Sequence, residues 1–572
     1  MNKKLKNKLT VIDFFCGAGG FSEGFRQMGF EIIQGYDLWR PAIETYNHNF
    51  GTNSTIKNIL DFKDIEEIEA LPETDVIIGS PPCVSFSSSN KSGKADKSLG
   101  VQLTECYLRI VAVKKHQKNS TLKAWFMENV VNSKRYLQPE YTFKDLKLED
   151  WAKSNKISPH KTAIVLLENT EVINSADFGS LQARKRVISG EIINKGELII
   201  PKPTHSNKKE STLPAHRTIS EMKRMLPSPF SSKKNILIND PSFNISIPLP
   251  DLTDHFYDTG IYAVDAKFSK HWKVNHPYMG KMSFPENENK PSRTIVATKT
   301  AHSRESIIYK SELKRNGDGE FRLPTAREAA TIMGFPITFQ FAGSEYTKWR
   351  LIGNAVCSSV SKELARTVLV AQKLSVPKTP IIQNKVNLKG MENLNTFKTK
   401  VFDNPPVKNK GAKCRWHPFK YGNLTVTLSN FRIGEDKKSK NKWFTSIQYG
   451  NGEGYPTHLV NDNTYTEIEP IIKSHSKGKR FLEILNNSFY EKIGSKKELQ
   501  NLFEKQTEIG GKKDPTELIE DLKKIIDSLV QDVETVDSSQ INIFKYKDKI
   551  PLKQVFALYG TNKIVSIANS KH

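Results

Sequence analysis

The sequence predicts an α/β protein built on a sheet of largely parallel strands, followed by a separate α+β extension toward the C-terminus. Three observations support this prediction. The first expected strand leads into a glycine-rich turn and an amphipathic helix, an order typical of nucleotide-binding sheets. Further short apolar runs alternate with helical segments in the residues that follow. Beyond Lys373 this pattern stops, and strands of alternating polarity appear instead.

The glycine-rich turn is the segment Asp13-Phe14-Phe15-Cys16-Gly17-Ala18-Gly19-Gly20, which closes an apolar strand expected over residues 9–14. Phe21 and Phe25 then share one face of a helix, and Gly29 is suited to end it. Glycines in such a turn let a ligand approach the backbone closely. A tight turn without a ligand is the alternative.

The second expected strand, over residues 31–36, is followed by Asp37, about 20 positions beyond the first glycine. An acid at this distance suits the hydroxyl groups of a ribose. Because the glycines do not form a complete GxGxxG pattern, they indicate a nucleoside-containing cofactor and nothing more specific.

Two later apolar runs end in side chains that can carry chemistry. Residues 74–79 lead through Ser80-Pro81-Pro82 to Cys83, and residues 124–127 lead to Glu128. Two prolines cannot continue a strand, so they present the thiol on a stiff corner. The carboxyl ends of parallel strands meet at one crevice. A thiol and a carboxylate there favour covalent catalysis with acid assistance, whereas an inert core cysteine and a solvated or helix-capping acid are the alternatives.

Composition narrows the class of partner. The formal net charge is +24 and the isoelectric point is about 9.5, which favours nucleic acid over a lysine-rich bias without a role. We expect no membrane span, because no apolar stretch is long enough, and no signal peptide. Five cysteines without metal-type spacing predict a reducing compartment and no metal site. A cytoplasmic protein fits these features.

Six short segments, in order over roughly residues 9–372, resemble the motifs of the DNA (cytosine-5)-methyltransferase family. They are DFFCGAGGF from Asp13, GSPPCVSFS from Gly79, MENV from Met127, NSADFGSLQARKR from Asn174, LPTAREAA with MGFP from Leu323, and IGNAV from Ile352. The resemblance implies a Rossmann-like sheet that uses S-adenosylmethionine, a smaller target-recognition domain, and double-stranded DNA as the substrate.

The resemblance also implies a mechanism. The Cys83 thiolate attacks C6 of a flipped-out cytosine, Glu128 assists at N3, and C5 takes the methyl group of S-adenosylmethionine. Arg184 and Arg186 hold the target nucleotide and support the site. Residues 84–100 are expected to form a mobile loop that closes over DNA. The DNA contacts expected by resemblance are Ser87, near a phosphate, and Thr294, in the core of the recognition region.

For the cofactor, Phe15 resembles the aromatic residue that packs on the adenine, and Asp37 the acid that binds the ribose. Asn58 stands where the family usually has Asp, with Asp61 as an alternative. The full set expected at the cofactor is Asp13, Phe15, Gly17, Gly19, Gly20, Asp37, Leu38, Asn58, Ile59, Pro82, Asn354 and Val356. Val84, Leu38 and Cys357-Ser358 depart from common family residues, and these departures concern cofactor geometry rather than the reaction.

Five regions are expected along the chain. They are a catalytic domain over 1–190, a target-recognition domain over 191–320, a return to the catalytic domain over 321–372, a linker over 373–412 and an α+β domain over 413–572.

Within the last region, the alternation Leu424, Val426, Leu428 predicts a strand that forms a hairpin with a second strand after Trp443. Asp514, with Pro515 and Glu517, predicts a helix start. Its apolar face is expected to join a core.

Three roles for the C-terminal region remain open: a DNA-binding or specificity module, an interaction module, and a fused restriction endonuclease. The endonuclease ranks third, because no spacing of acids and lysine indicates a nuclease. For the whole chain, a tRNA cytosine-5 methyltransferase and a catalytically inactive DNA-binding protein are the alternatives. We expect a monomer whose partner is a cognate restriction endonuclease acting on the same site.

Overall fold

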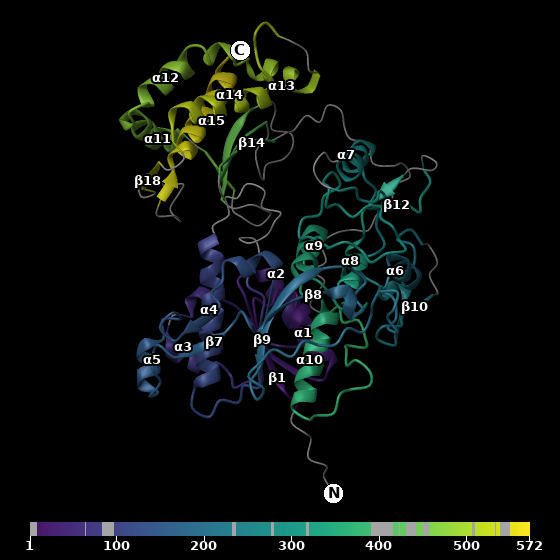
Figure 1. Ribbon diagram of the computed structural model, residues 1–572. Coiled ribbons are helices and arrows are strands. Elements are labelled where there is room, and N and C mark those ends of the chain that lie inside the picture. The colour runs from purple at the N-terminus through teal and green to yellow at the C-terminus, as the bar shows by residue number, and fades with distance from the viewer. Residues whose placement is uncertain are drawn as a thin grey trace. The chain divides into compact units, whose positions relative to one another are not determined.

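The computed structural model divides the chain into two compact units, Met1–Val407 and Lys408–His572 (Figure 1). In the first unit it describes residues 8–62, 64–82, 97–231, 236–275, 280–315 and 320–389. In the second it describes residues 416–421, 424–430, 442–449, 457–460, 462–505, 509–531, 534–537, 541 and 549–571. Cys83, Ser87 and the rest of the expected loop up to residue 96 lie outside the described residues.

The first unit is built on a seven-stranded sheet of order β3-β2-β1-β4-β5-β9-β8. The five strands from β3 to β5 in this order are mutually parallel, β9 is antiparallel to β5, and β8 is antiparallel to β9. Their bounds are β1 Thr10–Phe14, β2 Glu31–Asp37, β3 Thr55–Ile56, β4 Val76–Gly79, β5 Ala124–Asn129, β8 Thr170–Asn174 and β9 Lys185–Ile192. The strand order reverses between β1 and β4, which is where open α/β sheets bind ligands. The predicted α/β class is confirmed.

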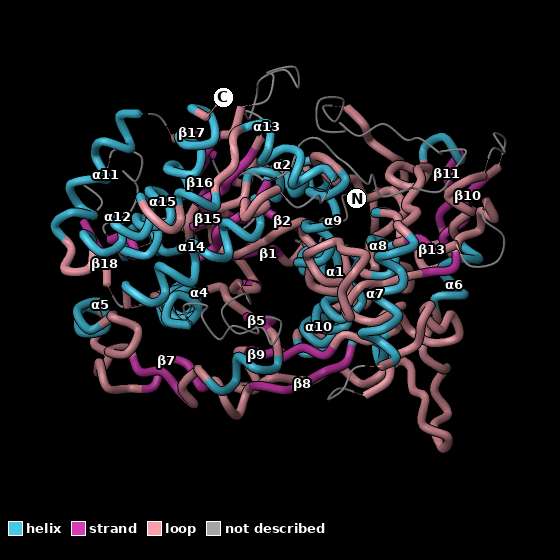
Figure 2. Tube along the Cα trace, turned by 90° about the horizontal axis from the view of Figure 1, so that it is seen from above, coloured by secondary structure: helices cyan, strands magenta, loops and turns pink. Residues whose placement is uncertain are grey.

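Helices cover both faces of this sheet, so its strands are apolar on both sides. The helices α1 (Gly20–Gln27) and α10 (Ser358–Ala371) lie on one face, and α3 (Ile65–Glu69) and α4 (Lys97–His116) on the other (Figures 1 and 2). Successive strand residues alternate between the two cores: Val11 packs on the α1 side and Ile12 on the α4 side. Because α4 begins at Lys97, residues 97–100 are helical rather than part of the expected loop.

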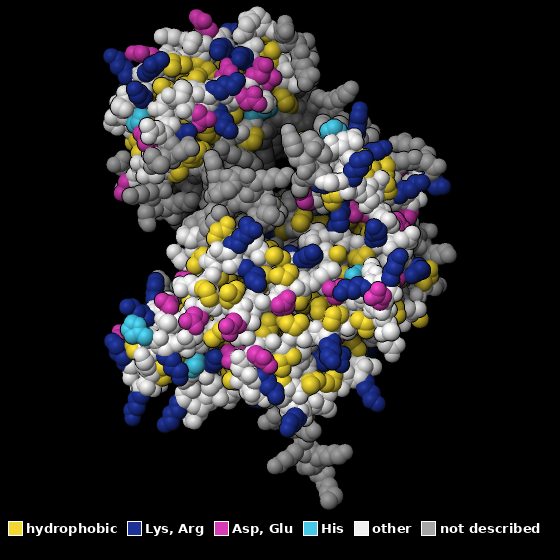
Figure 3. Space-filling model, viewed as in Figure 1, with side chains coloured by type: hydrophobic (Ala, Val, Ile, Leu, Met, Phe, Trp, Pro, Cys, Tyr) yellow, Lys and Arg dark blue, Asp and Glu magenta, His cyan; other side chains and the backbone are white. Residues whose placement is uncertain are grey.

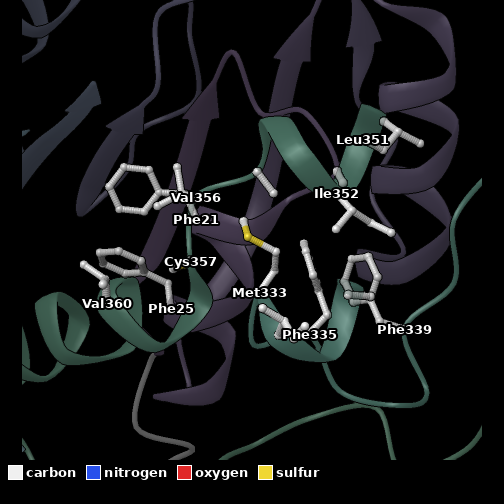
Figure 4. Packing of buried hydrophobic residues seen from close by; sticks show 14 of the residues in the cluster. Phe21, Phe25, Met333, Phe335, Phe339, Leu351, Ile352, Val356, Cys357 and Val360 are labelled. Atoms are coloured by element: carbon white, nitrogen blue, oxygen red, sulfur yellow. The ribbon is translucent and has the colours of Figure 1, made fainter. Parts of the chain in front are cut away.

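Two glycines bring α1 close to the last motif of the first unit. A Cβ on Gly24 would lie 2.0 Å from Ser361 Oγ, and a Cβ on Gly20 would lie 2.2 Å from the carbonyl oxygen of Val356. Side chains of α1 and of this last motif form one cluster, with Phe21 and Phe25 beside Val356 and Val360 (Figure 4). Because Gly20 and Gly24 carry no Cβ, α1 can pack directly against Val356 and the first residues of α10.

The other elements of the first unit are short. They are α2 Arg40–Phe50, α5 Glu149–Ser154, α6 Ile219–Met225, α7 Ala263–Val274, α8 Ala326–Ile332, α9 Glu345–Asn354, β6 Glu140–Thr142, β7 Thr162–Val165, β10 Leu237–Asp240, β11 Ile245–Pro248, β12 Tyr309–Lys310 and β13 Phe321–Arg322, with 3-10 turns η1 Ile59–Asp61, η3 Val131–Arg135, η4 Ser175–Phe178 and η5 Leu249–Asp251. Among the residues of 191–320 that the structure describes, the expected recognition region contains the helices α6 and α7 and short strands.

The segment after α10 differs from the linker expected there. Ile381 N donates to Gln27 O at 3.0 Å, and Thr338 Oγ1 donates to Gln383 O at 2.7 Å. Val376 and Val386 are half-buried against the core of the first unit. Residues 373–389, the first part of the expected linker over 373–412, are therefore attached to the first unit by hydrogen bonds and apolar packing.

The second unit is α+β, as predicted. A four-stranded antiparallel sheet of order β14-β15-β16-β17 packs against helices through one apolar cluster that includes Val426, Ile447 and Leu522. The expected hairpin pairs β15 with β16, and the expected helix begins after Asp514, whose carboxylate accepts from Glu517 N at 3.0 Å. The bounds are β14 Trp416–Tyr421, β15 Leu424–Ser429, β16 Phe444–Tyr449, β17 Thr457–Leu459, α11 Asp462–Ser474, α12 Gly478–Asn486, η6 Tyr490–Lys492, α13 Lys496–Lys505, α14 Pro515–Leu529, β18 Thr535–Asp537, β19 Lys549–Pro551 and α15 Leu552–Ser570.

Two surface properties bear on function. Among the described helices, none combines the length and the apolar character that crossing a membrane requires. On the face drawn in Figure 3, Lys and Arg side chains are spread among acidic and apolar ones rather than gathered in one patch. This distribution agrees with basic residues that recur along the whole sequence.

Candidate active site

The carboxyl ends of β1, β2, β4 and β5 bring two groups of predicted residues to one edge of the sheet. Gly17 and Asp37 form the first group, and Glu128 and Arg186 form the second. The strands β1 and β4 are direct neighbours, with Phe14 paired to Gly79. The two groups therefore flank the point where the strand order reverses.

Glu128 is the central residue of the second group. Its side chain is buried, and its two carboxylate oxygens have different partners: Arg186 Nε lies 3.0 Å from Oε1, and Ser80 Oγ donates to Oε2 at 2.7 Å. Arg186 reaches Glu128 because β9 pairs with β5, which sets Ile188 opposite Glu128. The pairing orients the carboxylate through charge-assisted hydrogen bonds.

The chain is held firmly where it leaves β4 toward Cys83. Ser80 N donates to Phe14 O at 3.2 Å, and Asn129 Nδ2 donates to Pro81 O at 3.4 Å. Pro82, an expected cofactor contact, is exposed and is the last described residue before Cys83. The residues that lead to Cys83 are thus hydrogen-bonded to both neighbouring strands, β1 and β5.

Arg184 occupies a different position from Arg186. It is buried, and its guanidinium donates to Ile295 O at 2.9 Å and to Gly353 O at 3.3 Å. The expected DNA contact Thr294 lies beside it, with Oγ1 donating to Ala183 O at 3.3 Å. Arg184 thus joins three segments of the first unit through its guanidinium.

Gln182, which precedes this arginine in the same motif, joins the same segments. Its Oε1 accepts from Ile295 N at 3.1 Å, and its Nε2 donates to Cys357 Sγ at 3.2 Å. Cys357, one of the departures from the family pattern, is therefore a buried packing residue at the start of α10.

In the first group, the Asp37 carboxylate lies against the backbone of the glycine-rich turn. Asp37 accepts from Gly17 N at 2.9 Å and from Trp39 N at 2.8 Å, one bond to each carboxylate oxygen. Burial raises the pKa of Asp37, and these backbone donors oppose that rise. A Cβ on Gly17 would meet no atom within 4 Å, and the backbone there has φ +52°. The backbone at Gly17 is therefore open to a ligand, next to the partly exposed carboxylate of Asp37.

Apolar side chains border this edge. Leu38 is 66% exposed and Ile56 is 51% exposed, although both are large and hydrophobic. Phe15 has a left-handed backbone, with φ 57°, and is partly buried. Asn354 is exposed at the end of α9. Such surfaces suit a flat heterocycle more than a polar ligand alone.

Other residues expected at the cofactor lie behind the edge rather than on it. The side chains of Asp13, Ile59 and Val356 are 1%, 1% and 5% exposed. Gly19 faces the ring of Phe50, because a Cβ there would lie 2.3 Å from it. These buried residues support the glycine-rich turn from the side of the core. The side chains of Asp13 and Ile59 are buried, and their place at the cofactor stays a prediction.

Asn58 already has a local partner. Its Oδ1 accepts from Leu60 N at 3.2 Å and so caps the short turn η1. A carbonyl oxygen has two lone pairs, so one acceptor position of the amide remains for a ligand. Asp61, the alternative, is exposed within the same turn.

Comparison with known proteins decides the family. A model described as C-5 cytosine-specific DNA methylase matches residues 9–369. The chain belongs to this family.

Relatives of this DNA (cytosine-5)-methyltransferase carry similar names. "Type II methyltransferase M.NgoFVII" of Neisseria gonorrhoeae is 27% identical over 385 residues, which cover 64% of this chain and 87% of that protein. "Type II methyltransferase M.HgiDI" of Herpetosiphon aurantiacus is 28% identical over 379 residues, 63% of this chain and 94% of that protein. "Type II methyltransferase M.HgiGI" of the same organism is 43% identical over 129 residues, 21% of this chain and 90% of that protein. The second unit lies beyond the family model.

The family uses S-adenosylmethionine as the methyl donor, and the first group fits such a ligand. The open backbone at Gly17, the acceptor Asp37 and the exposed Leu38 and Ile56 provide contacts for an amine, a ribose and an adenine. Two further residues at this edge carry no signal in the sequence. Ser80 Oγ donates to Glu128, and Trp39 N donates to Asp37. The Arg350 guanidinium lies over the Trp39 ring, 4.7 Å from its centroid.

Proposed function

We propose that this methyltransferase modifies C5 of a flipped-out cytosine within a specific sequence of double-stranded DNA, through a covalent bond between Cys83 Sγ and C6. One observation carries the proposal. Arg186 and Ser80 hold Glu128 at the sheet edge, and only Pro81 and Pro82 separate Ser80 from Cys83 in the chain. A nucleophile and an acid group on neighbouring strand ends are what addition to an aromatic ring requires.

The residues act in a balanced sequence. The Cys83 thiolate adds to C6, and the electron pair of the C5–C6 bond becomes available at C5. Glu128 holds a proton at N3, which limits the negative charge on the ring. Bound S-adenosylmethionine would supply the methyl group that C5 takes up, and S-adenosylhomocysteine would leave with the electron pair of the broken sulfur–methyl bond. A water molecule then accepts the C5 proton, the electron pair of the C5–H bond restores the C5–C6 double bond, and the Cys83–C6 bond breaks to release the thiolate.

The target base must leave the duplex before this chemistry can occur, at a cost of a few kcal/mol. We assign the reading of the sequence to residues 191–320, and contacts to the DNA backbone to Ser87 and Thr294. Arg184 supports this arrangement, because it bonds to Ile295 next to Thr294. Phosphate contacts of this kind position the duplex, and base contacts select the sequence.

The biological setting follows from the relatives. Their printed names are those of type II methyltransferases, and we propose that this chain likewise protects DNA from a cognate restriction endonuclease acting on the same site. It would act as a monomer in the bacterial cytoplasm, on nucleoid DNA, and without a metal ion.

Bisulfite sequencing of DNA from cells that express the chain tests the proposal. Methylated cytosines in one sequence context support it. Unmodified DNA together with methylated cytosine in tRNA would overturn it in favour of a tRNA methyltransferase. Cys83→Ser provides the mechanistic control: it abolishes transfer while binding of S-adenosylmethionine, measured by calorimetry, persists. Full activity of Cys83→Ser would refute the covalent step.

A further inference from the structure

Ser80 donates from Oγ to Glu128 Oε2 at 2.7 Å, and the proposed mechanism does not yet use it. We infer that Ser80 is a positioning residue. It orients Glu128 and connects this carboxylate to the residues that lead to Cys83. The inference rests on the proposed role of Glu128 and goes beyond it.

The position of Ser80 is fixed by tight packing. The preceding residue, Gly79, pairs with Phe14 on one side and with Met127 on the other. A Cβ on Gly79 would lie 2.5 Å from the ring of Tyr107. The end of β4 therefore has little freedom, and Ser80 starts from a well-defined point beside Glu128.

The hydroxyl group suits a carboxyl that gains and loses a proton. Arg186 is always a donor, so it can bond only to a lone pair of Glu128. A serine hydroxyl donates to a carboxylate and, after rotation, accepts from a carboxylic acid. Ser80 therefore holds Oε2 in place in both protonation states, while the heavy atoms stay where they are.

The same hydroxyl links the acid to the nucleophile. Only Pro81 and Pro82 separate Ser80 from Cys83, and proline fixes φ. Asn129, the residue after Glu128, holds Pro81 through its side chain. Glu128 and Asn129, which are consecutive in β5, thus bond to Ser80 and Pro81, which are consecutive in the segment leading to Cys83. Misplacing Glu128 would lower the rate of the chemical step more than it would weaken DNA binding.

The test compares Ser80→Ala and Ser80→Thr with the full-length wild type, on a plasmid whose methylated sites have been mapped by bisulfite sequencing. Loss of one charge-assisted hydrogen bond predicts a fall in kcat of roughly tenfold or more in Ser80→Ala. Ser80→Thr keeps the hydroxyl and restores most of kcat. KM for DNA and the dissociation constant of S-adenosylmethionine stay within about twofold. Ser154→Ala, which removes an exposed hydroxyl on α5, is the matched control with unchanged kcat.

A further readout separates positioning from a general loss of structure. In a double-mutant cycle, Ser80→Ala lowers the residual rate of Glu128→Gln by less than about twofold. A wild-type kcat in Ser80→Ala, or an equal loss in the Glu128→Gln background, would overturn the inference. An active Cys83→Ser variant would instead overturn the proposed function, so the two failures are distinguishable.

Discussion

Arg184 donates to the backbone carbonyl of Ile295 at 2.9 Å, and this bond joins the catalytic sheet to the segment that carries Thr294. The same guanidinium reaches Gly353 O at 3.3 Å, in the last family motif. Three segments far apart in the sequence thus meet at one buried cation. A planar group with several donors is required, because the two carbonyls lie in different parts of the chain.

Arg184→Lys should therefore lower the free energy of unfolding by about 1–3 kcal/mol, since one ammonium cannot replace the fork and a buried carbonyl loses its partner. Urea denaturation measures this difference. Lys185→Gln, at the exposed neighbouring position, should change stability by less than about 0.5 kcal/mol. Equal stabilities for Arg184→Lys and wild type would show that the joint is not a structural one.

Gly17 in the first family motif and Gly24 in the following helix α1 should both lose stability on substitution by alanine, for different reasons. Gly24→Ala places a methyl group 2.0 Å from Ser361 Oγ and 2.3 Å from Lys362 N, so it should destabilise the fold by about 1–3 kcal/mol. Gly17→Ala meets no neighbour but has a positive φ, which costs about 1–2 kcal/mol.

Calorimetric titration with S-adenosylmethionine separates the two variants. Gly17→Ala weakens binding, because the new methyl group enters the open edge beside Asp37. Gly24→Ala leaves the affinity of the folded protein unchanged. The reverse pattern would place the cofactor away from Gly17.

The parts of the site that sequence could predict are those set by local pattern. Asp37 and Glu128 stand at the ends of apolar runs, and this alone places them at the carboxyl edge of a parallel sheet. The contact between Glu128 and Arg186 was not predictable in this way, because it depends on the register of β9 against β5. The segment 373–389 looked like a linker from its composition. Its attachment depends on hydrogen bonds such as that between Ile381 N and Gln27 O, which composition does not encode.

Asp13 should make stability depend on pH. Its carboxyl is 1% exposed and accepts from Ser22 Oγ at 2.6 Å, and burial raises its pKa to about 8 from 3.8. Between these two values the folded protein retains a proton that the unfolded chain releases. The free energy of unfolding therefore falls as pH rises, by up to about 1.4 kcal/mol per pH unit from this group.

Asp13→Asn removes the ionisable group and should flatten this dependence in urea denaturation at pH 5, 6, 7 and 8. Asp150→Asn, at a fully exposed side chain, is the matched control and should keep the wild-type slope. If Asp13→Asn and wild type lose stability in parallel over this range, Asp13 is already ionised in the folded protein.

Incubation of the full chain with unmethylated plasmid and magnesium tests the third role considered for the second unit. No group of described His, Cys, Asp and Glu residues could hold a metal ion, and the expectation from sequence ranks a nuclease last. We expect supercoiled plasmid to stay intact on an agarose gel. Specific cleavage would assign the second unit to an endonuclease.

The position of a C-terminal truncation should reveal where the methyltransferase unit ends. The apolar clusters of the first unit contain no described residue of the second, so a chain ending at residue 389 should fold by itself. A chain ending at residue 372 loses the hydrogen bonds of Ile381 and Gln383 and the packing of Val376 and Val386. It should be less stable than the longer truncation by about 2–4 kcal/mol. Urea denaturation of the two truncated chains measures this difference, and equal midpoints would restore the linker interpretation of residues 373–389.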